Sequence, residues 1–302
     1  MQGLYTWFQS EDKNVSRSVE SIFHGAERAY DLYLSLLQLP LEIAAEEERY
    51  YSDLQPGYTK KTVDVKSKFS GNQIIIGLNG HVQFNELYKK RKLSWQKHHD
   101  LIKKLFYNLR QSEEYKSYIN SDDHSVEEDI EFLKLVYKQI IMPSEVLQTT
   151  IDEQNIWWAD AVEFINSMVL KTIKTFQDNT EEPFQLLPLY RDNEDDREFM
   201  EKLFRETVKN DEYFEQMIEA KTKNWELERI ALVDVILMKM ALAEIISFSG
   251  IPVKVSINEY IDISKEFSTP KSKIFINGVL DKIVSDLKSE GKIKKTGRGL
   301  IE

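Results

Sequence analysis

The chain has 302 residues, of which 41% are hydrophobic and none is cysteine, and its formal net charge is −11. The lack of cysteine excludes disulfides and thiolate metal sites, and it fits a reducing compartment. The sequence contains neither a run of eighteen apolar residues nor the pattern of a secretory signal, so we expect a cytoplasmic protein without membrane spans.

The charge is unevenly distributed along the chain. Residues 120–224 hold 25 acidic and 11 basic residues, whereas residues 271–302 hold 8 basic and 4 acidic residues. Residues 86–110 form a second basic zone, with eight lysines and arginines against two acidic residues. The negative total argues against nucleic acid as a partner, but the two basic zones leave RNA open, with the acidic middle directed away from it.

The first half of the chain is predicted to be mostly helical. One apolar stripe at helical spacing opens the chain, formed by Met1, Leu4, Tyr5 and Phe8. A long helical segment follows from Ser16 to Tyr51, bent or broken at Pro40. The turn residues in Gln55–Gly80 predict a loop.

The middle of the chain shows a clear helix start and a clear boundary. The capping box Ser125 to Glu128 predicts a helix that reaches Ile141, before Pro143. Another helix is predicted from Trp157 to about Phe176. The proline-containing, acidic stretch of residues 178–196 is the predicted linker.

Three helices are predicted in the last quarter. Asn224 resembles the N-cap of a helix from Trp225 to about Phe248. A capping box at Ser256 and Glu259 opens the second helix, to about Phe267, and Thr269-Pro270 opens the third, to about Gly291. Short links between them predict an antiparallel bundle, and the fold class is all-α.

The motifs of common enzyme classes do not occur in the sequence. None of the five histidines forms a helical zinc pair, and the glycine patterns of phosphate loops, dinucleotide folds and nucleophile elbows are missing. Carboxylates are abundant, but the sequence does not single out an acid–base pair. We therefore expect no metal, no cofactor, no small-molecule substrate and no catalysis.

The last predicted helix carries a possible contact surface. Its core stripe consists of Ile276, Val279, Leu280, Ile283 and Leu287. Phe275 lies about 100° from Ile276 around the helix axis. It either widens the buried face or, beside Lys271 and Lys273 at a positive helix N-terminus, stacks on a base while the lysines hold phosphates.

Several segments together resemble the NusB family of transcription antitermination factors. These are the opening Gln2-Gly3-Leu4-Tyr5 and the runs REFMEKLFRETVKN, NWELERIALVDVILMKMALAEII, IPVKVSINEY and IDISKEFSTPKSKIFINGVLDKI. The resemblance predicts a NusB-like helical core at residues 1–40 and 195–291, and a basic flexible tail at 292–302. Residues 41–194 have no counterpart in short members and resemble the large helical insertion of a longer branch.

The resemblance also implies a function. Family members bind the single-stranded boxA element of ribosomal RNA leaders together with a ribosomal protein, NusE, within the RNA polymerase elongation complex, and they are not enzymes. The positions that match the family's RNA-facing surface are Gln2, Tyr5, Lys271, Lys273, Phe275 and Asn277. Glu228 and Asp234 match acidic positions near the partner contacts, or they form a solvated acidic edge. Gly278 serves either close helix packing or RNA.

This chain departs from the family pattern in two places. Ile274 stands where short members often have lysine, and the arginine-rich segment that precedes Gln-x-Leu-Tyr in the family is missing before Gln2. If the chain starts at Met1, we expect weak RNA binding. The basic run from Tyr88 to Lys92, with Trp95 and His98, either compensates for this loss or is a solvated helix face.

Two other functions compete with RNA binding. The first is a protein-interaction scaffold that acts through the insertion with little RNA affinity of its own. The second is the regulatory domain of a ribosomal RNA methyltransferase, which is disfavoured because no cofactor-binding domain follows Lys288.

Overall fold

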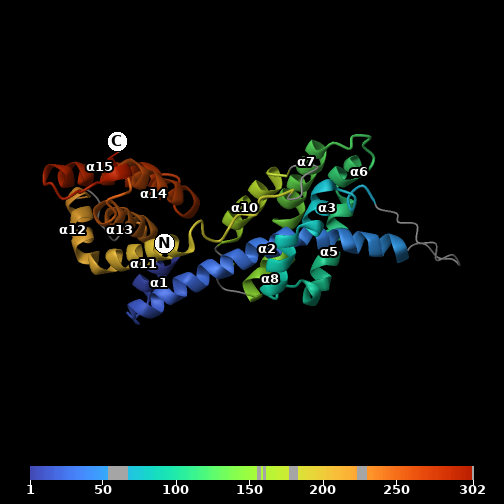
Figure 1. Ribbon diagram of the computed structural model, residues 1–302, viewed down its shortest axis with the longest axis horizontal. Coiled ribbons are helices and arrows are strands. Elements are labelled where there is room, and N and C mark those ends of the chain that lie inside the picture. Colours follow the sequence, from blue (N-terminus) through green and yellow to red (C-terminus); the bar gives the residue numbers. More distant parts are fainter. Residues whose placement is uncertain (54–66, 155–157, 159–160, 177–182, 223–229, 301–302) are drawn as a thin grey trace. The chain divides into compact units, whose positions relative to one another are not determined.

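The computed structural model describes residues 1–53, 67–154, 158, 161–176, 183–222 and 230–300. These residues form helices and connecting segments without a strand, as the all-α prediction requires. They divide into two compact units (Figure 1): unit 1 comprises Met1–His24 and Tyr190–Glu302, and unit 2 comprises Gly25–Leu189. Among the described helices, none is long and apolar enough to span a membrane.

The helices of unit 1 are α1 (Gln2–Gln9), the start of α2 (Val15–Asp53), α11 (Asn193–Lys209), α12 (Asp211–Lys221), α13 (Leu232–Ser247), α14 (Val253–Phe267) and α15 (Ser272–Ser289). Unit 2 contains the rest of α2, followed by α3 (Gln73–Gly80), α4 (Val82–Lys90), α5 (His99–Gln111), α6 (Glu113–Ile119), α7 (Val126–Val136), α8 (Glu145–Gln154) and α10 (Val162–Lys174). The boundary at residues 24–25 lies within α2, sixteen residues before the boundary expected from the sequence.

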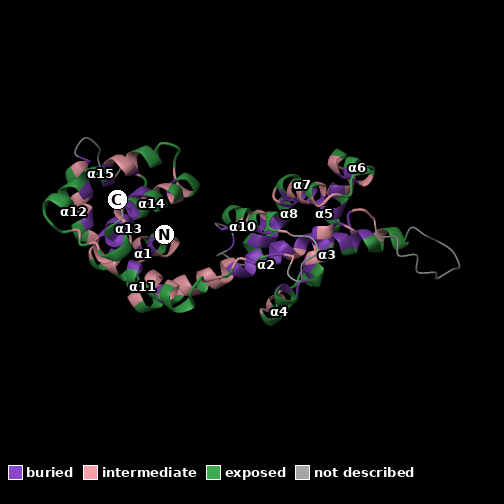
Figure 2. Cartoon of the chain, turned by 45° about the horizontal axis from the view of Figure 1, so that its top comes forward, coloured by how far each residue is buried: buried purple, intermediate pink, exposed green. Residues whose placement is uncertain are grey.

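Helix α13 is the centre of unit 1. It packs against α1, α11, α12, α14 and α15, and every residue from Asp234 to Ile245 is buried (Figure 2). The residues before it, 223–229, lie outside the described part, including the predicted N-cap Asn224 and the predicted partner residue Glu228. The described helix begins at Leu232 rather than at Trp225.

Lys239 places a cation inside this apolar helix. Its Nζ lies 2.5 Å from Oδ1 of Asp211 and 2.7 Å from Oε2 of Glu215, both on α12, and 5.1 Å from the ring centre of Phe8 on α1. A buried ammonium needs such partners, because an unpaired charge in the interior is costly. Lys239 therefore links α13 to α12 and to α1.

The start of α14 differs from its predicted cap, whereas the end of α15 lies near the predicted Gly291. Helix α14 begins at Val253 after Pro252, so Ser256 is a fully buried residue of its first turns, and the prediction of a capping box there is wrong. Ser256 lies within the helix because its side chain is buried, and a local sequence motif contains no information about burial. Helix α15 ends at Ser289, and Gly291 then adopts a φ of +64°, a conformation that glycine accepts without strain.

The residues after α15 make specific contacts, unlike the flexible tail expected for 292–302. Nζ of Lys295 donates to the carbonyl of Phe248 at 2.8 Å, and the backbone N–H of Thr296 donates to the carbonyl of Ser249 at 2.9 Å. These bonds cover carbonyl groups after the end of α13, which lack partners within that helix.

Helix α2 continues across Pro40, so the chain is not broken at that residue. Proline has no N–H, so the carbonyl of Leu36 loses its helical donor. Tyr137, in a π-helical turn at Tyr137–Ile141, donates its hydroxyl to this carbonyl at 2.8 Å, and Nε1 of Trp95 donates to the adjacent carbonyl of Ser35 at 2.9 Å. Side chains from later helices thus complete the bonding of α2.

The segment predicted as a loop at 55–80 contains helix α3. Residues 54–66 lie outside the described part, but Asn72 caps the helix by accepting the backbone N–H of Ile74 at 3.0 Å. The buried side chains of Ile74, Ile75 and Leu78 then join the core of unit 2. The loop prediction is therefore wrong for residues 73–80, because Asn72 acts as a helix cap rather than as a turn residue.

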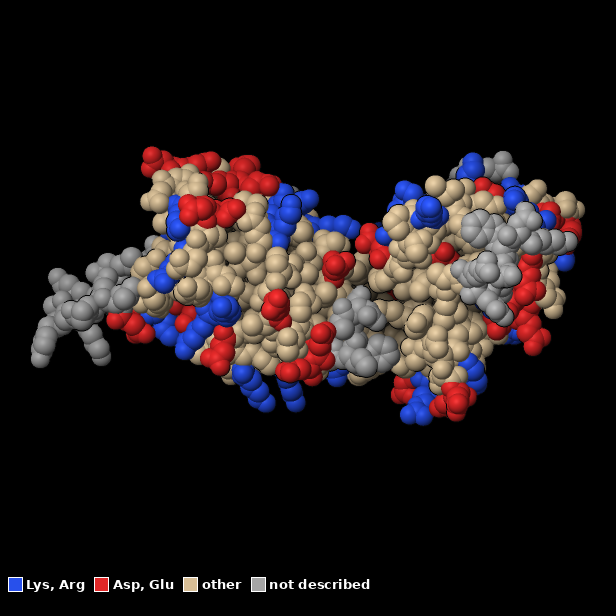
Figure 3. Space-filling model, turned by 180° about the vertical axis from the view of Figure 1, so that it is seen from behind, with Lys and Arg blue, Asp and Glu red and all other residues tan. Residues whose placement is uncertain are grey.

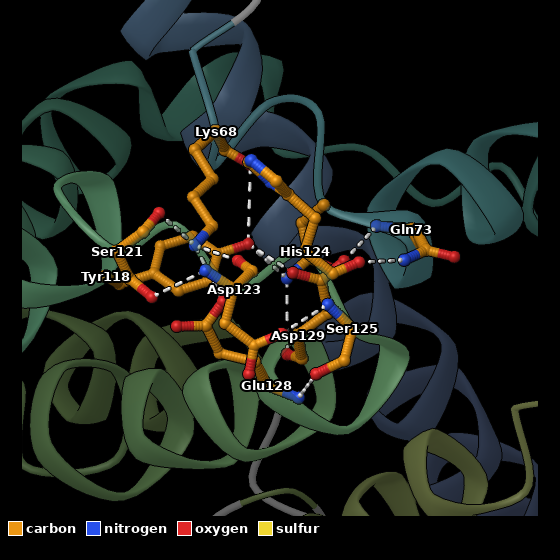
Figure 4. Close-up of polar contacts among 10 residues, drawn as sticks. Lys68, Gln73, Tyr118, Ser121, Asp123, His124, Ser125, Glu128 and Asp129 are labelled. Atoms are coloured by element: carbon orange, nitrogen blue, oxygen red, sulfur yellow. Dashed lines mark hydrogen bonds and ion pairs between the residues drawn. The ribbon is translucent and has the colours of Figure 1, made fainter.

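A polar network connects this segment with α7 (Figure 4). Nζ of Lys68 lies 2.6 Å from Oε2 of Glu128, and Oδ2 of Asp129 accepts the backbone N–H of Gln73 at 2.8 Å. Ser125 accepts the N–H of Glu128 at 3.2 Å, which confirms the predicted start of α7. The network fixes α3 on α7, and both lie in the residues expected to form the insertion.

Glu47 is a buried carboxylate on α2. Its oxygens accept hydrogen bonds from the hydroxyls of Tyr115 and Ser67, and from the backbone N–H of Ser70 at 3.2 Å. Burial raises the pKa of Glu47 despite these donors. The folded state therefore holds a proton on Glu47 more tightly than the unfolded chain does.

The role of Tyr137 can be tested by removing its hydroxyl. We expect Tyr137→Phe to lower the free energy of unfolding by about 1–3 kcal/mol, because the buried carbonyl of Leu36 loses its donor. In a Pro40→Ala background the helix regains its own N–H donor, so the same substitution should cost less. Urea denaturation of the four proteins of this cycle measures the coupling. Tyr107→Phe, at a 53% exposed position, is the control with no expected effect. Equal costs in both backgrounds would contradict this role.

The protonation of Glu47 predicts a pH dependence of stability. Because its folded-state pKa lies above that of an unfolded glutamate, the free energy of unfolding decreases as the pH rises through the folded-state pKa. As the pH rises above 4.5, the ordinary pKa of glutamate, the melting temperature of the native chain should fall more than that of Glu47→Gln. Glu86→Gln, at an exposed position of α4, is the control and should follow the native curve. Parallel curves for the native chain and Glu47→Gln would disprove this assignment.

Candidate nucleic-acid interface

Helix α1 presents Tyr5 to solvent and buries Leu4 and Trp7. Leu4 and Trp7 are buried, with Trp7 edge-on to Phe204 at 5.7 Å between ring centres, whereas Tyr5 is 43% exposed. The predicted apolar stripe is therefore wrong at Tyr5, and Trp7 takes its place in the core. Tyr5 lies on the surface, with Gln2 partly exposed near the start of the same helix.

Gly3 sets how closely α1 approaches the start of α2. A Cβ atom at position 3 would overlap the side chain of Ile22. Glycine is therefore required here by a close approach of two helices within unit 1. This close packing holds Gln2 and Tyr5 in place beside the first residues of α2.

The start of α15 is held by a cluster of hydroxyl groups. Ser268 donates to Oδ1 of Asp234 at 2.5 Å and lies 3.0 Å from Oγ of Ser272, which also lies 2.8 Å from Oγ1 of Thr269. Asp234 is 5% exposed, so it is neither a surface contact nor a solvated edge in this structure. It acts instead as the anchor of the connection between α14 and α15, which the sequence did not indicate.

Two exposed lysines lie at the start of α15. Lys271 and Lys273 are both exposed, and neither makes an ion pair with any residue in the described ranges. The turn contains no acidic residue, and the N-terminus of a helix is itself positive. This turn can therefore receive an anion such as a phosphate group.

Phe275 and its neighbours provide the rest of the candidate surface. Phe275 is partly buried and packs against the core of unit 1, while Ile274 is 72% exposed. Asn277 is partly exposed and donates from Nδ2 to Asp281 at 3.1 Å. An added Cβ at Gly278 would meet nothing within 4 Å among the described residues, so close helix packing does not explain this glycine.

The predicted residues form two groups supported by one helix. Helix α1 packs on α11 and α13, whereas α15 packs on α12, α13 and α14. In Figures 1 and 2, α13 lies between α15 and α11, with α1 beside α11. Gln2 and Tyr5 thus share the α13 support with the α15 group, and within the described chain no hydrogen bond or ion pair joins the two groups.

Comparison with known proteins finds similarity in the second half of the chain. Residues 160–285 match the NusB family. The transcription antitermination protein NusB of Salinibacter ruber is 51% identical over 78 residues, which are 26% of this chain and 49% of that protein. The protein of the same name from Chloroherpeton thalassium is 49% identical over 79 residues, which are 26% of this chain and 37% of that protein.

The match to these relatives is partial. The chain spans less than half the length of either curated relative. No solved structure gives a significant match to the chain.

The two alternatives for Phe275 predict different effects of removing its ring. A ring that widens the buried face stabilises the fold, whereas a ring that only stacks on a base does not. Because its ring packs on the core, Phe275→Ala should lower the free energy of unfolding by about 1–3 kcal/mol. Ile274→Ala, at the neighbouring exposed position, should change it by less than about 0.5 kcal/mol. Chemical denaturation of both variants measures the difference. An unchanged stability in Phe275→Ala would mean that the ring makes no contribution to the core.

Proposed function

Because residues 160–285 match the NusB family, we propose that this chain is a transcription antitermination factor whose unit 1 binds RNA. The observation that carries the proposal is the first turn of α15, where Lys271 and Lys273 are exposed at a positive helix end and form no ion pair with the described residues. An RNA phosphate fits this turn, since both the helix end and the two ammonium groups favour negative charge.

The aromatic and amide side chains would supply the contacts to bases. Tyr5 is exposed enough to stack on a base, and Phe275 offers the part of its ring that the core does not cover. Asn277 and Gln2 carry hydrogen-bonding amides on the same two helices. An added Cβ at Gly278 would meet nothing within 4 Å among the described residues, so the backbone next to Asn277 is accessible from that side.

The proposed RNA is a single-stranded boxA-type element of a ribosomal RNA leader. The proposed partner is the ribosomal protein that acts as NusE, within an RNA polymerase elongation complex. Both are proposed because members of the family bind them. Asp234 takes the role of a positioning residue, because it is buried and orients the hydroxyls that precede α15.

The proposal predicts that Lys271→Gln/Lys273→Gln weakens binding of boxA-type RNA. Removal of each phosphate-binding lysine should reduce the slope of log affinity against log salt by about 0.7, so the slope of the double variant should be smaller by about 1.4. Fluorescence anisotropy with a labelled boxA RNA at several salt concentrations, with and without NusE, measures this change. The matched control is Lys209→Gln/Lys254→Gln, which removes the same charge from exposed positions on α11 and α14.

Two results would contradict the proposal. One is the absence of boxA binding by the native chain even when NusE is present. The other is an equal loss of affinity in the α15 variant and in its control, because the α15 turn would then contribute only to the net charge.

A further inference from the structure

Unit 2 contains a positively charged cleft that the proposed function does not use. The cleft has a volume of about 510 Å³ and lies between α2, the segment 91–98 and the end of α8. The charged side chains that line it are Arg28, Arg91, Lys92, Lys97 and Asp31. Four cations therefore face one carboxylate in a region of the chain where no RNA contact is expected from the family.

The wall of the cleft is built from fixed groups. Arg91 donates to Asp31 at 2.7 Å and to Glu27 at 2.7 Å, and Arg28 donates to the other oxygen of Asp31 at 3.0 Å. Trp95 is only 3% exposed, and its Nε1 donates a hydrogen bond to the carbonyl of Ser35 on α2. The arginines neutralise the carboxylates of α2, so these carboxylates do not repel an incoming anion.

Lys92 occupies a backbone conformation that normally belongs to glycine. Its φ of +55° makes it the left-handed residue after α4, where the N–H of Leu93 bonds back to the carbonyl of Tyr88 at 3.2 Å. A residue with a Cβ atom costs about 1 kcal/mol in this conformation, so glycine would be more stable. The chain therefore keeps a charged side chain at this position at some cost in stability. Lys92 and Lys97 are exposed and form no ion pair with any residue that the structure describes.

Further lysines occur in the chain just before and just after the segment 91–98. Lys89 and Lys90 are exposed on the last turn of α4, and Lys103 and Lys104 are exposed on α5, opposite its buried residues. Acidic side chains of unit 2 gather instead over α6 and α7, visible as one red corner in Figure 3. A row of separated cations fits an extended chain of phosphates better than a single small anion, which needs converging donors.

We propose that this cleft, with the lysines beside it, is a second RNA-binding surface that contacts the phosphates of single-stranded RNA without reading its sequence. Because Trp95 is buried, it does not offer a face for base stacking, and the contacts are those of a backbone-tracking groove. The surface lies in unit 2, so it is independent of the boxA contacts proposed for unit 1.

The test uses the full chain and the variant Lys92→Gln/Lys97→Gln. The probes are two unrelated 20-nucleotide single-stranded RNAs that lack boxA, and anisotropy is measured at several salt concentrations. Removal of two phosphate-binding lysines should reduce the salt slope by about 1.4 for both RNAs. The control variant Lys171→Gln/Lys174→Gln removes the same charge from exposed positions on α10 and should leave the slope unchanged.

Three outcomes would overturn the inference: an equal reduction in both variants, an unchanged slope in the cleft variant, or full displacement of the RNA by inorganic phosphate at matched phosphate concentration. The last would identify a site for a small anion. Lys271→Gln/Lys273→Gln distinguishes the two proposals, since it should reduce the preference for boxA while binding of the unrelated RNAs through the cleft persists. Failure of either variant leaves the other proposal standing.

Discussion

The carbonyl groups that precede Pro40 impose the main constraint on unit 2. Proline removes one donor from the middle of α2, and the hydroxyl of Tyr137 replaces it from a π-helical turn far along the chain. Trp95 bonds to the adjacent carbonyl of Ser35 and is buried there. These two bonds fix the segments after α4 and after α7 on α2. The basic cleft depends on them, because Trp95 forms its wall.

In unit 1, buried charged side chains hold neighbouring helices in place, as the hydrogen bonds to the carbonyls of α2 do in unit 2. Helix α13 is apolar except for a few side chains, and two of these hold neighbouring helices. Lys239 binds two carboxylates of α12, and Asp234 binds the serine that leads into α15. Since each buried charge is stable only with its partners in place, the pairs specify where α12 and α15 lie. The exposed lysines at the start of α15 are positioned in this way.

Local signals in the sequence predicted some helix ends and failed at others. The start of α7 follows from Ser125, and the end of α15 from Gly291, because both act through backbone groups a few residues away. Two local predictions failed. Asn72 caps a helix inside the segment predicted as a loop, and Ser256, predicted to open a helix, is buried inside one. The exposure of Tyr5 and the burial of Asp234 depend on packing between distant segments. Periodicity and spacing do not contain that information.

The net charge of −11 is a poor guide to what this chain binds, because charges act locally. At physiological salt the Debye length is about 8 Å, so an exposed lysine and a carboxylate on another part of the surface hardly affect each other. What matters to a phosphate is the set of groups within that distance. The first turn of α15 contains no acidic residue, and the carboxylate of Asp234 nearby is buried and accepts a hydrogen bond from Ser268. In the cleft around Lys92 the described carboxylates are already bound to arginine. An acidic protein can thus present two surfaces whose local charge suits phosphate groups, while the acidic residues of α6 and α7 form a separate, negative part of unit 2.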